Sequence, residues 1–160
     1  MSSAAPAETR VEAVSAPSPP IHRMAVALLS LVGLFISAYL LLHKLGAIGS
    51  LACGTGSCDT VQASPWAVFL GVPVPAWGVA GYGLLLAVSL VGLQPGLWGS
   101  RRVGRALVVL GAGAFGFSAY LTAIEAFVIH AWCRWCVGSA VVATLIFIFT
   151  LGELIRPGSR

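Results

Sequence analysis

Residues 24–42 read MAVALLSLVGLFISAYLLL, a run of nineteen residues without a single charged side chain. An α-helix rises about 1.5 Å per residue, so a helix of this length matches the thickness of the apolar core of a bilayer. Surface helices of soluble proteins instead carry polar residues on one face. The run therefore predicts a membrane-spanning helix, and it decides which class of fold the rest of the chain can adopt.

The composition of the whole chain agrees with a membrane domain. Of its 160 residues, 58% are hydrophobic and only 9% are charged, whereas about a quarter of the residues are charged in an average soluble domain. These values exclude a soluble globular protein. The formal net charge of +4 comes from basic residues that form no cluster, so nucleic acid is not an expected partner.

Three further apolar segments are long enough to span a bilayer. Residues 23–155 are therefore predicted to form an all-α integral membrane domain, a bundle of four transmembrane helices. The predicted helices cover residues 24–42, 74–93, 105–129 and 137–154. Residues 1–22, rich in proline, alanine and serine, are expected to be a disordered tail, and residues 156–160 a short second tail.

Basic residues predict the orientation of the bundle. Arg101, Arg102 and Arg105 lie in the connection between the second and third helices, and four more arginines flank the first and last helices, namely Arg10, Arg23, Arg156 and Arg160. Cytoplasmic segments of membrane proteins carry the excess of basic residues. Both termini are therefore expected in the cytoplasm, and the connection over residues 43–73 is expected on the outer side.

Four cysteines occur as two pairs on this expected outer face. Cys53-Gly-Thr-Gly-Ser-Cys58 lies in the long connection, and Cys133-Arg-Trp-Cys136 lies at the start of the last helix. Cysteines outside the cytoplasm are driven towards disulfides, so two structural bridges are one interpretation. A C-x-x-C at a helix N-terminus, however, favours a thiolate that is competent for exchange. Gly54 and Gly56 allow the other pair to move, which favours a redox relay.

Electrons in such a relay pass from an external dithiol to the loop pair and then to the C-x-x-C pair. They must then leave the protein, and the chain has neither room for a flavin domain nor a c-type haem motif. A lipid-soluble quinone, reached from inside the bundle, is the most economical acceptor. No metal is required.

The connection between the two pairs carries signals for a short helix. Asp59-x-x-Gln62 has the pattern of a capping box, and Ser64-Pro65 has that of an N-cap followed by a first-turn proline. We expect a half-helix over Trp66-Ala-Val-Phe-Leu70. It would lie in the membrane interface, either as a lid over the bundle, with Trp66 as a quinone-binding or supporting residue, or as a simple anchor.

Glu125 is predicted in the outer half of the third helix, about two turns before Cys133. A carboxylate inside a bilayer is costly and commonly functional. This one could orient the site or relay a proton to a reduced quinone, whereas at the level of the headgroups it would have neither role.

The order and spacing of these residues resemble the vitamin K epoxide reductase family, specifically its bacterial members. The resemblance covers about residues 24–154. It rests on Cys53…Cys58-Asp59-x-Val61, Ser64-Pro65-Trp66-Ala67, Gly71-Val72-Pro73, Gly78, Tyr82 and Cys133-x-x-Cys136. It implies a four-helix bundle around a quinone, with a half-helix lid that carries a mobile cysteine pair, in a bacterial inner or plasma membrane.

The resemblance also implies a role for each cysteine. Cys53 would exchange with a DsbA-like or thioredoxin-like extracytoplasmic partner, and Cys58 would pass the electrons to Cys133. Cys136 would reduce menaquinone or ubiquinone, with Ser64 in support. The implied redox-active disulfides are Cys53–Cys58, Cys133–Cys136 and a transient Cys58–Cys133. Many bacterial relatives carry a fused thioredoxin-like domain, whereas this chain ends at Arg160, so the partner is expected to be a separate protein.

Other readings of the cysteines remain open. Four thiols could carry a soft ion such as Hg or Cu(I) across the membrane, or two pairs could hold a zinc ion. A carrier needs ligands spread through the membrane, and all four cysteines are expected on one side. Membrane oxidases of the DsbB type use the same chemistry, but their C-x-x-C lies in the first outer loop.

Overall fold

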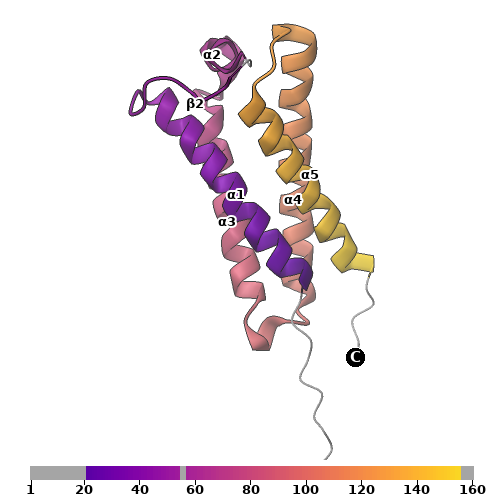
Figure 1. Cartoon of the computed structure of the whole chain (residues 1–160). Coiled ribbons are helices and arrows are strands. Elements are labelled where there is room, and N and C mark those ends of the chain that lie inside the picture. The colour runs from indigo at the N-terminus through magenta and orange to yellow at the C-terminus, as the bar shows by residue number, and fades with distance from the viewer. Residues whose placement is uncertain (1–20, 55–56, 156–160) are drawn as a thin grey trace, which may run out of the picture.

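The structure, a computed structural model, describes residues 21–54 and 57–155. Four long helices form a bundle (Figure 1). They are α1 (Ile21–Lys44), α3 (Val74–Gly92), α4 (Arg101–Ile124) and α5 (Arg134–Ile155). Each contributes a segment long and apolar enough to cross a membrane. The predicted all-α bundle of four transmembrane helices is confirmed.

Three helices begin earlier than predicted: α1 at Ile21, α4 at Arg101 and α5 at Arg134. Arginine is a good helix former, so the charged residues beside an apolar run continue the helix instead of ending it. Ile21 and His22 are thus helical, contrary to the predicted tail over residues 1–22. The rest of that tail and the predicted tail over residues 156–160 lie outside the described residues.

α1 and α3 approach closely because small residues on one helix face larger ones on the other. Gly33 lies against the ring of Tyr82, and Gly78 lies against Ser37, with no space for a Cβ at either glycine. Lipid competes equally well for apolar side chains, so helices in a membrane depend on such close packing for their association.

The connections lie at opposite ends of the bundle (Figure 1). The α3–α4 connection, which contains a 3₁₀ turn over Pro95–Leu97, lies at the end where α1 begins and α5 ends. At the other end are the α4–α5 junction and α2 (Cys58–Ala63). This end therefore holds both cysteine pairs.

The half-helix expected over residues 66–70 is wrong. The helix in this connection is α2, which ends at Ala63, and it is followed by a 3₁₀ turn over Pro65–Ala67. The chain then forms a hairpin in which β1 (Val68–Phe69) pairs with β2 (Val72–Pro73). Leu70 and Gly71 have positive φ angles of 54° and 78°, the backbone of a tight hairpin turn. Gly71 makes that turn possible, so the apolar run forms strands.

Of the two predicted caps in this connection, the one at Asp59 is wrong, whereas Ser64 does precede a turn whose first residue is Pro65. Ser57, not Asp59, precedes the first residue of α2, and it makes no side-chain capping bond. Ser64 precedes the 3₁₀ turn, but its hydroxyl donates back to the Val61 carbonyl at 2.7 Å. Ser64 therefore ends α2 and also starts the 3₁₀ turn, in which its carbonyl accepts the Ala67 N–H at 3.0 Å.

Arg23 ties the opposite end of the bundle together. Its side chain is 3% exposed. Nη1 donates to the carbonyls of Gly92 at 2.9 Å and Leu97 at 2.8 Å, and Nη2 donates to that of Ser100 at 3.3 Å. The last carbonyls of a helix lack partners within it, so this guanidinium satisfies the end of α3 and fixes the α3–α4 connection against α1.

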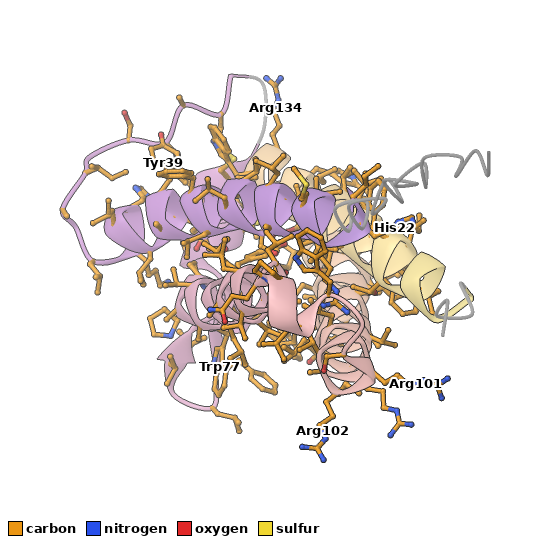
Figure 2. The ribbon with its side chains drawn as sticks, turned by 90° about the horizontal axis from the view of Figure 1, so that it is seen from below. His22, Tyr39, Trp77, Arg101, Arg102 and Arg134 are labelled. Atoms are coloured by element: carbon orange, nitrogen blue, oxygen red, sulfur yellow. A yellow bond between two sulfur atoms is a disulfide. The ribbon has the colours of Figure 1, made fainter. Side chains whose placement is uncertain are left out.

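We expect Arg23→Met to lower the free energy of unfolding by about 2 to 4 kcal/mol, because the carbonyls of Gly92, Leu97 and Ser100 lose their hydrogen bonds to a buried, charged donor. Unfolding with SDS from a mild detergent measures the change. Arg101→Met is the matched control, since the exposed Arg101 side chain points away from the bundle (Figure 2). Equal unfolding free energies for the two variants would contradict this role of Arg23.

Candidate functional site

The C-x-x-C pair forms the N-terminus of α5. Cys133 directly precedes the helix, and its carbonyl accepts the Val137 N–H at 2.9 Å. Its sulfur accepts the N–H of Cys136 at 3.3 Å. Cys133 therefore stands where a Ser or Asp cap usually stands, and its sulfur satisfies one of the free N–H groups of the first turn.

The position of Cys133 makes its thiol more acidic. The hydrogen bond with the Cys136 thiol lowers the pKa of Cys133 below its ordinary value, and the backbone N–H groups of Cys136 and Trp135 act in the same direction. Burial and the Glu125 carboxylate oppose this shift without cancelling it. Because thiolates are the species that attack disulfides, Cys133 is suited to exchange.

The other pair is a disulfide. Cys53 and Cys58 are bonded, with their Cα atoms 6.2 Å apart, and Cys58 is the first residue of α2. Gly54 has a φ angle of +57°, which lets the chain turn directly after Cys53. Cys133 and Cys136 are both free thiols. The Cys133–Cys136 disulfide and the transient Cys58–Cys133 bond stay predictions.

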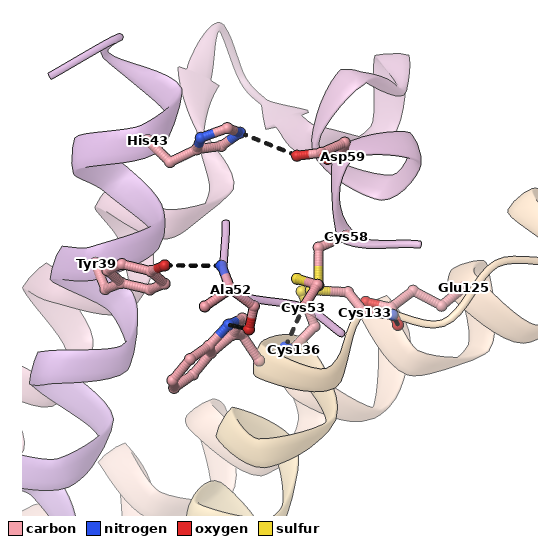
Figure 3. The surroundings of a disulfide bond; sticks show 10 residues. Tyr39, His43, Ala52, Cys53, Cys58, Asp59, Glu125, Cys133 and Cys136 are labelled. Atoms are coloured by element: carbon pink, nitrogen blue, oxygen red, sulfur yellow. Dashed lines mark hydrogen bonds and ion pairs between the residues drawn. A yellow bond between two sulfur atoms is a disulfide. The ribbon is translucent and has the colours of Figure 1, made fainter. Parts of the chain in front are cut away.

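Both pairs belong to one apolar cluster at the end of the bundle (Figure 3). Cys53, Cys58 and Cys133 are only 6%, 1% and 0% exposed, and Cys136 packs against the same cluster. Neighbouring apolar side chains complete it, among them Leu40, Leu51, Val61 and Ala131. Two cysteine pairs that are far apart in the chain thereby lie in one cluster, which is the first requirement for exchange between them.

Glu125 lies beside this cluster. It opens a single π-helical turn, Glu125–Ile129, that continues α4. The wider turn and the left-handed backbone of His130, with a φ angle of 54°, bring the chain back towards the bundle. As a result, Glu125 Oε2 accepts the backbone N–H of Cys133 at 3.1 Å. The carboxylate is 4% exposed, so Glu125 is a buried group of the site and not a surface residue.

A cavity of about 140 Å³ lies inside the bundle next to these groups. All four transmembrane helices contribute to its walls, and most of the side chains are apolar. Cys136, Glu125, Ser64 and Trp66 all line it, so the four predicted site residues that are not in the cluster core meet at one cavity. A small apolar cavity with a few polar groups is typical of a ligand site.

The cavity also contains a polar pair that the sequence analysis missed. Tyr82 donates its hydroxyl to the Ser139 carbonyl at 2.9 Å, and the two side-chain oxygens are 2.9 Å apart. Ser139 follows Cys136 by three residues and so shares its helix face, a signal that could have found it. No pattern in the sequence predicts that Tyr82 meets Ser139 or Cys136 at this cavity.

A sequence profile of the vitamin K epoxide reductase family matches residues 24–151, which include both cysteine pairs. The chain belongs to the vitamin K epoxide reductase family. The resemblance found in the sequence is confirmed. With its four apolar helices the protein is a multi-pass membrane protein, and the family assigns it to the membrane disulfide oxidoreductases. Proteins of this family generally use a quinone and a thioredoxin-like partner.

This member of the vitamin K epoxide reductase family has no evident metal centre in its described part. Across the side chains that the structure describes, in residues 21–54 and 57–152, no three His, Cys, Asp or Glu residues form a group that could hold a metal ion. The four cysteines are arranged as one disulfide and one dithiol.

The lowered pKa of Cys133 leads to a prediction about the pH at which its thiolate forms. The thiolate absorbance at 240 nm should appear at a lower pH than that of an ordinary cysteine, whose pKa is about 8.5, in protein that retains the Cys53–Cys58 disulfide. Cys136→Ala should move the midpoint upward, because it removes the thiol that stabilises the Cys133 thiolate. Cys133→Ala is the control that identifies the titrating group. An unchanged midpoint in Cys136→Ala would be the opposing result.

Proposed function

We propose that this protein oxidises the dithiol of a separate DsbA-like or thioredoxin-like extracytoplasmic protein and reduces a membrane quinone, ubiquinone or menaquinone. Its activity would support disulfide bond formation. The observation that carries the proposal is the position of Cys136, which belongs to the C-x-x-C pair and also lines the apolar cavity inside the bundle. A sulfur in this position can deliver electrons to an acceptor that arrives from the lipid.

The first step takes electrons from the partner. A partner thiolate attacks Cys53, the Cys53–Cys58 bond breaks, and Cys58 leaves as a thiolate. The second partner thiolate then displaces Cys53, so the partner departs as a disulfide while Cys53 and Cys58 are reduced. Two electrons have entered the protein.

The second step moves these electrons between the pairs. The Cys58 thiolate attacks Cys133 of a Cys133–Cys136 disulfide and releases Cys136 as a thiolate. Cys53 then attacks Cys58, which restores the Cys53–Cys58 disulfide and leaves Cys133 and Cys136 reduced. The common apolar cluster of the two pairs supports this transfer, and the oxidation states described above correspond to its end.

The third step reduces the quinone. The Cys133 and Cys136 dithiol gives two electrons and two protons, the Cys133–Cys136 disulfide forms, and the quinone becomes a quinol. We assign Glu125 to the proton path, because its carboxylate lines the cavity and accepts the Cys133 N–H. A buried carboxylate can take the thiol proton and pass it on to the quinone oxygen.

Ser64 and Trp66 are assigned to the outer wall of the quinone site. Both line the cavity, and the hairpin that follows them packs on the same end of the bundle. Phe69 contacts the rings of Trp77 and Phe117, which belong to α3 and α4. We propose that this segment keeps water away from the quinone head group.

The proposed orientation is that of a bacterial inner or plasma membrane protein with both termini in the cytoplasm. Arg101 and Arg102 begin α4, at the end of the bundle away from α2 and the cysteines (Figure 1), which agrees with the excess of basic residues on the cytoplasmic side of membrane proteins. The cysteine pairs would then face the extracytoplasmic space, where a secreted partner can reach them.

Anaerobic quinone reduction by the purified protein, supplied with a reduced DsbA-like protein, tests the proposal. Wild type should turn over, whereas Cys58→Ala and Cys136→Ala should lose activity, because each removes a sulfur that the relay needs. In a separate reaction with the oxidised partner, the Cys53 thiolate of Cys58→Ala should attack the partner disulfide and form a mixed disulfide with release of one partner thiolate, and Cys58 is no longer present to resolve it. No quinone reduction, together with tight binding of Cu(I) or Hg by the thiols, would contradict the proposal and favour a soft-metal carrier.

Glu125→Gln separates the proton step from the exchange steps. Glutamine keeps an oxygen that can accept the Cys133 N–H, but it cannot accept a proton. We expect the rate of quinone reduction to fall by roughly 10- to 100-fold, while reduction of the Cys53–Cys58 disulfide by the partner keeps its wild-type rate. Wild-type quinone reduction in Glu125→Gln would remove Glu125 from the mechanism.

A further inference from the structure

The Cys53–Cys58 disulfide is closed off from a protein partner. Cys53 is 6% exposed and Cys58 is 1% exposed. A partner thiolate has to approach a sulfur along the axis of the disulfide bond, and a folded partner cannot enter the apolar cluster. The chain around Cys53 must therefore move outward before the partner reacts, and return before Cys58 can reach Cys133.

Two aromatic residues, Tyr39 and Trp135, hold this chain in its closed position by hydrogen bonds with the backbone N–H and carbonyl of Ala52. The Ala52 N–H donates to the Tyr39 hydroxyl at 3.0 Å, as Figure 3 shows. The Ala52 carbonyl accepts the indole N–H of Trp135 at 3.3 Å. The two rings also pack against each other, with centroids 5.1 Å apart. We call Tyr39, Ala52 and Trp135 the Ala52 clasp.

The clasp joins three separate parts of the protein. Tyr39 belongs to α1, Ala52 directly precedes Cys53, and Trp135 lies between the two cysteines of the C-x-x-C pair. Arg134, the other residue between these cysteines, also reaches the loop, since a Cβ at Gly54 would lie 3.0 Å from its Nη1. Both residues inside the C-x-x-C motif thus lie against the segment that carries Cys53.

The far end of the connection, α2, is attached separately to α1. The Lys44 Nζ donates to the Gln62 carbonyl at 2.5 Å, and His43 lies 3.5 Å from the Asp59 carboxylate (Figure 3). These contacts hold α2, whereas the clasp holds the chain before Cys53 with two hydrogen bonds. Release of the clasp would expose Cys53 while α2 stays in place.

We propose that Tyr39 and Trp135 are positioning residues that set the balance between a closed state, in which the two cysteine pairs exchange, and an open state, in which the partner reaches Cys53. This proposal rests on the proposed function. It assigns a task to the residues inside the C-x-x-C motif: Trp135 keeps the first cysteine pair beside the second.

Tyr39→Phe and Trp135→Phe test the clasp, because each keeps an aromatic ring and removes one hydrogen bond to Ala52. The measurement is the rate at which a water-soluble phosphine reduces the Cys53–Cys58 disulfide without quinone, followed by thiol alkylation. We expect each variant to react roughly two- to tenfold faster than wild type, the range that one lost hydrogen bond produces. Tyr120→Phe and Trp132→Phe, whose side chains are 45% and 53% exposed, are the matched controls and should react at the wild-type rate.

Re-formation of the Cys53–Cys58 disulfide, which needs the closed state, supplies the second readout. After full reduction and addition of quinone, formation of the Cys53–Cys58 disulfide should be slower in the clasp variants, because the segment spends less time closed. A general loss of stability would also expose the disulfide to phosphine, but it would speed amide exchange in α2 as well, which release of the clasp leaves unchanged. Phosphine rates equal to wild type in both clasp variants would overturn the proposal, as would equal acceleration in the controls.

Amide hydrogen exchange gives an independent test if a clasp variant folds poorly. In Tyr39→Phe the Ala52 N–H loses its acceptor, so we expect faster exchange in a peptide covering residues 50–54 and unchanged exchange in α2. The phosphine and exchange measurements need neither the partner nor the quinone. Their outcome is therefore distinguishable from a failure of the proposed function, which would appear as absent quinone reduction in wild type.

Discussion

A bilayer core offers no hydrogen-bond partner to a peptide group, and this constraint determines the whole architecture. Every backbone N–H and carbonyl within the membrane must be satisfied inside its own segment, so the apolar runs form helices. Irregular backbone is confined to the ends of the bundle. Reactive groups that need free N–H donors, movable loops and access for a partner are found at one of these ends. The cavity lies next to the cysteine end, between the four helices.

The cysteine end shows how irregular backbone serves the site. The first turn of α5 has N–H groups without helical partners, and the sulfur of Cys133 accepts one of them. The π-helical turn before it places the Glu125 carboxylate against the Cys133 N–H. An extra residue in a turn changes the direction of the chain that follows it, so after a regular turn the Cys133 N–H would not meet this carboxylate. The acidity of Cys133 and the burial of Glu125 thus have a common origin in the α4–α5 junction.

Local patterns predicted the elements more reliably than their ends. The four spans follow from apolar length alone, but arginines extended three of them beyond the predicted starts. The connection between the first two spans was harder to predict. Ser64-Pro65 resembles a helix start, yet the Leu70-Gly71 turn reverses the chain and the apolar residues pair as strands. A two-residue turn decided this segment, and the residues on both sides of it have side chains that suit a strand as well as an interfacial helix.

The sequence by itself determined the membrane class, the number of spans, the clustering of the cysteines at one end and the family. These properties depend on apolar length, charge distribution and short motifs, all of which are local. Tertiary structure decided which side chains meet: Cys53 and Cys58 with Cys133, Cys136 with the cavity, Tyr82 with Ser139, and Tyr39 with Trp135 across Ala52. Such contacts depend on helix rotation and close packing between segments far apart in the chain. No pattern within one segment contains that information.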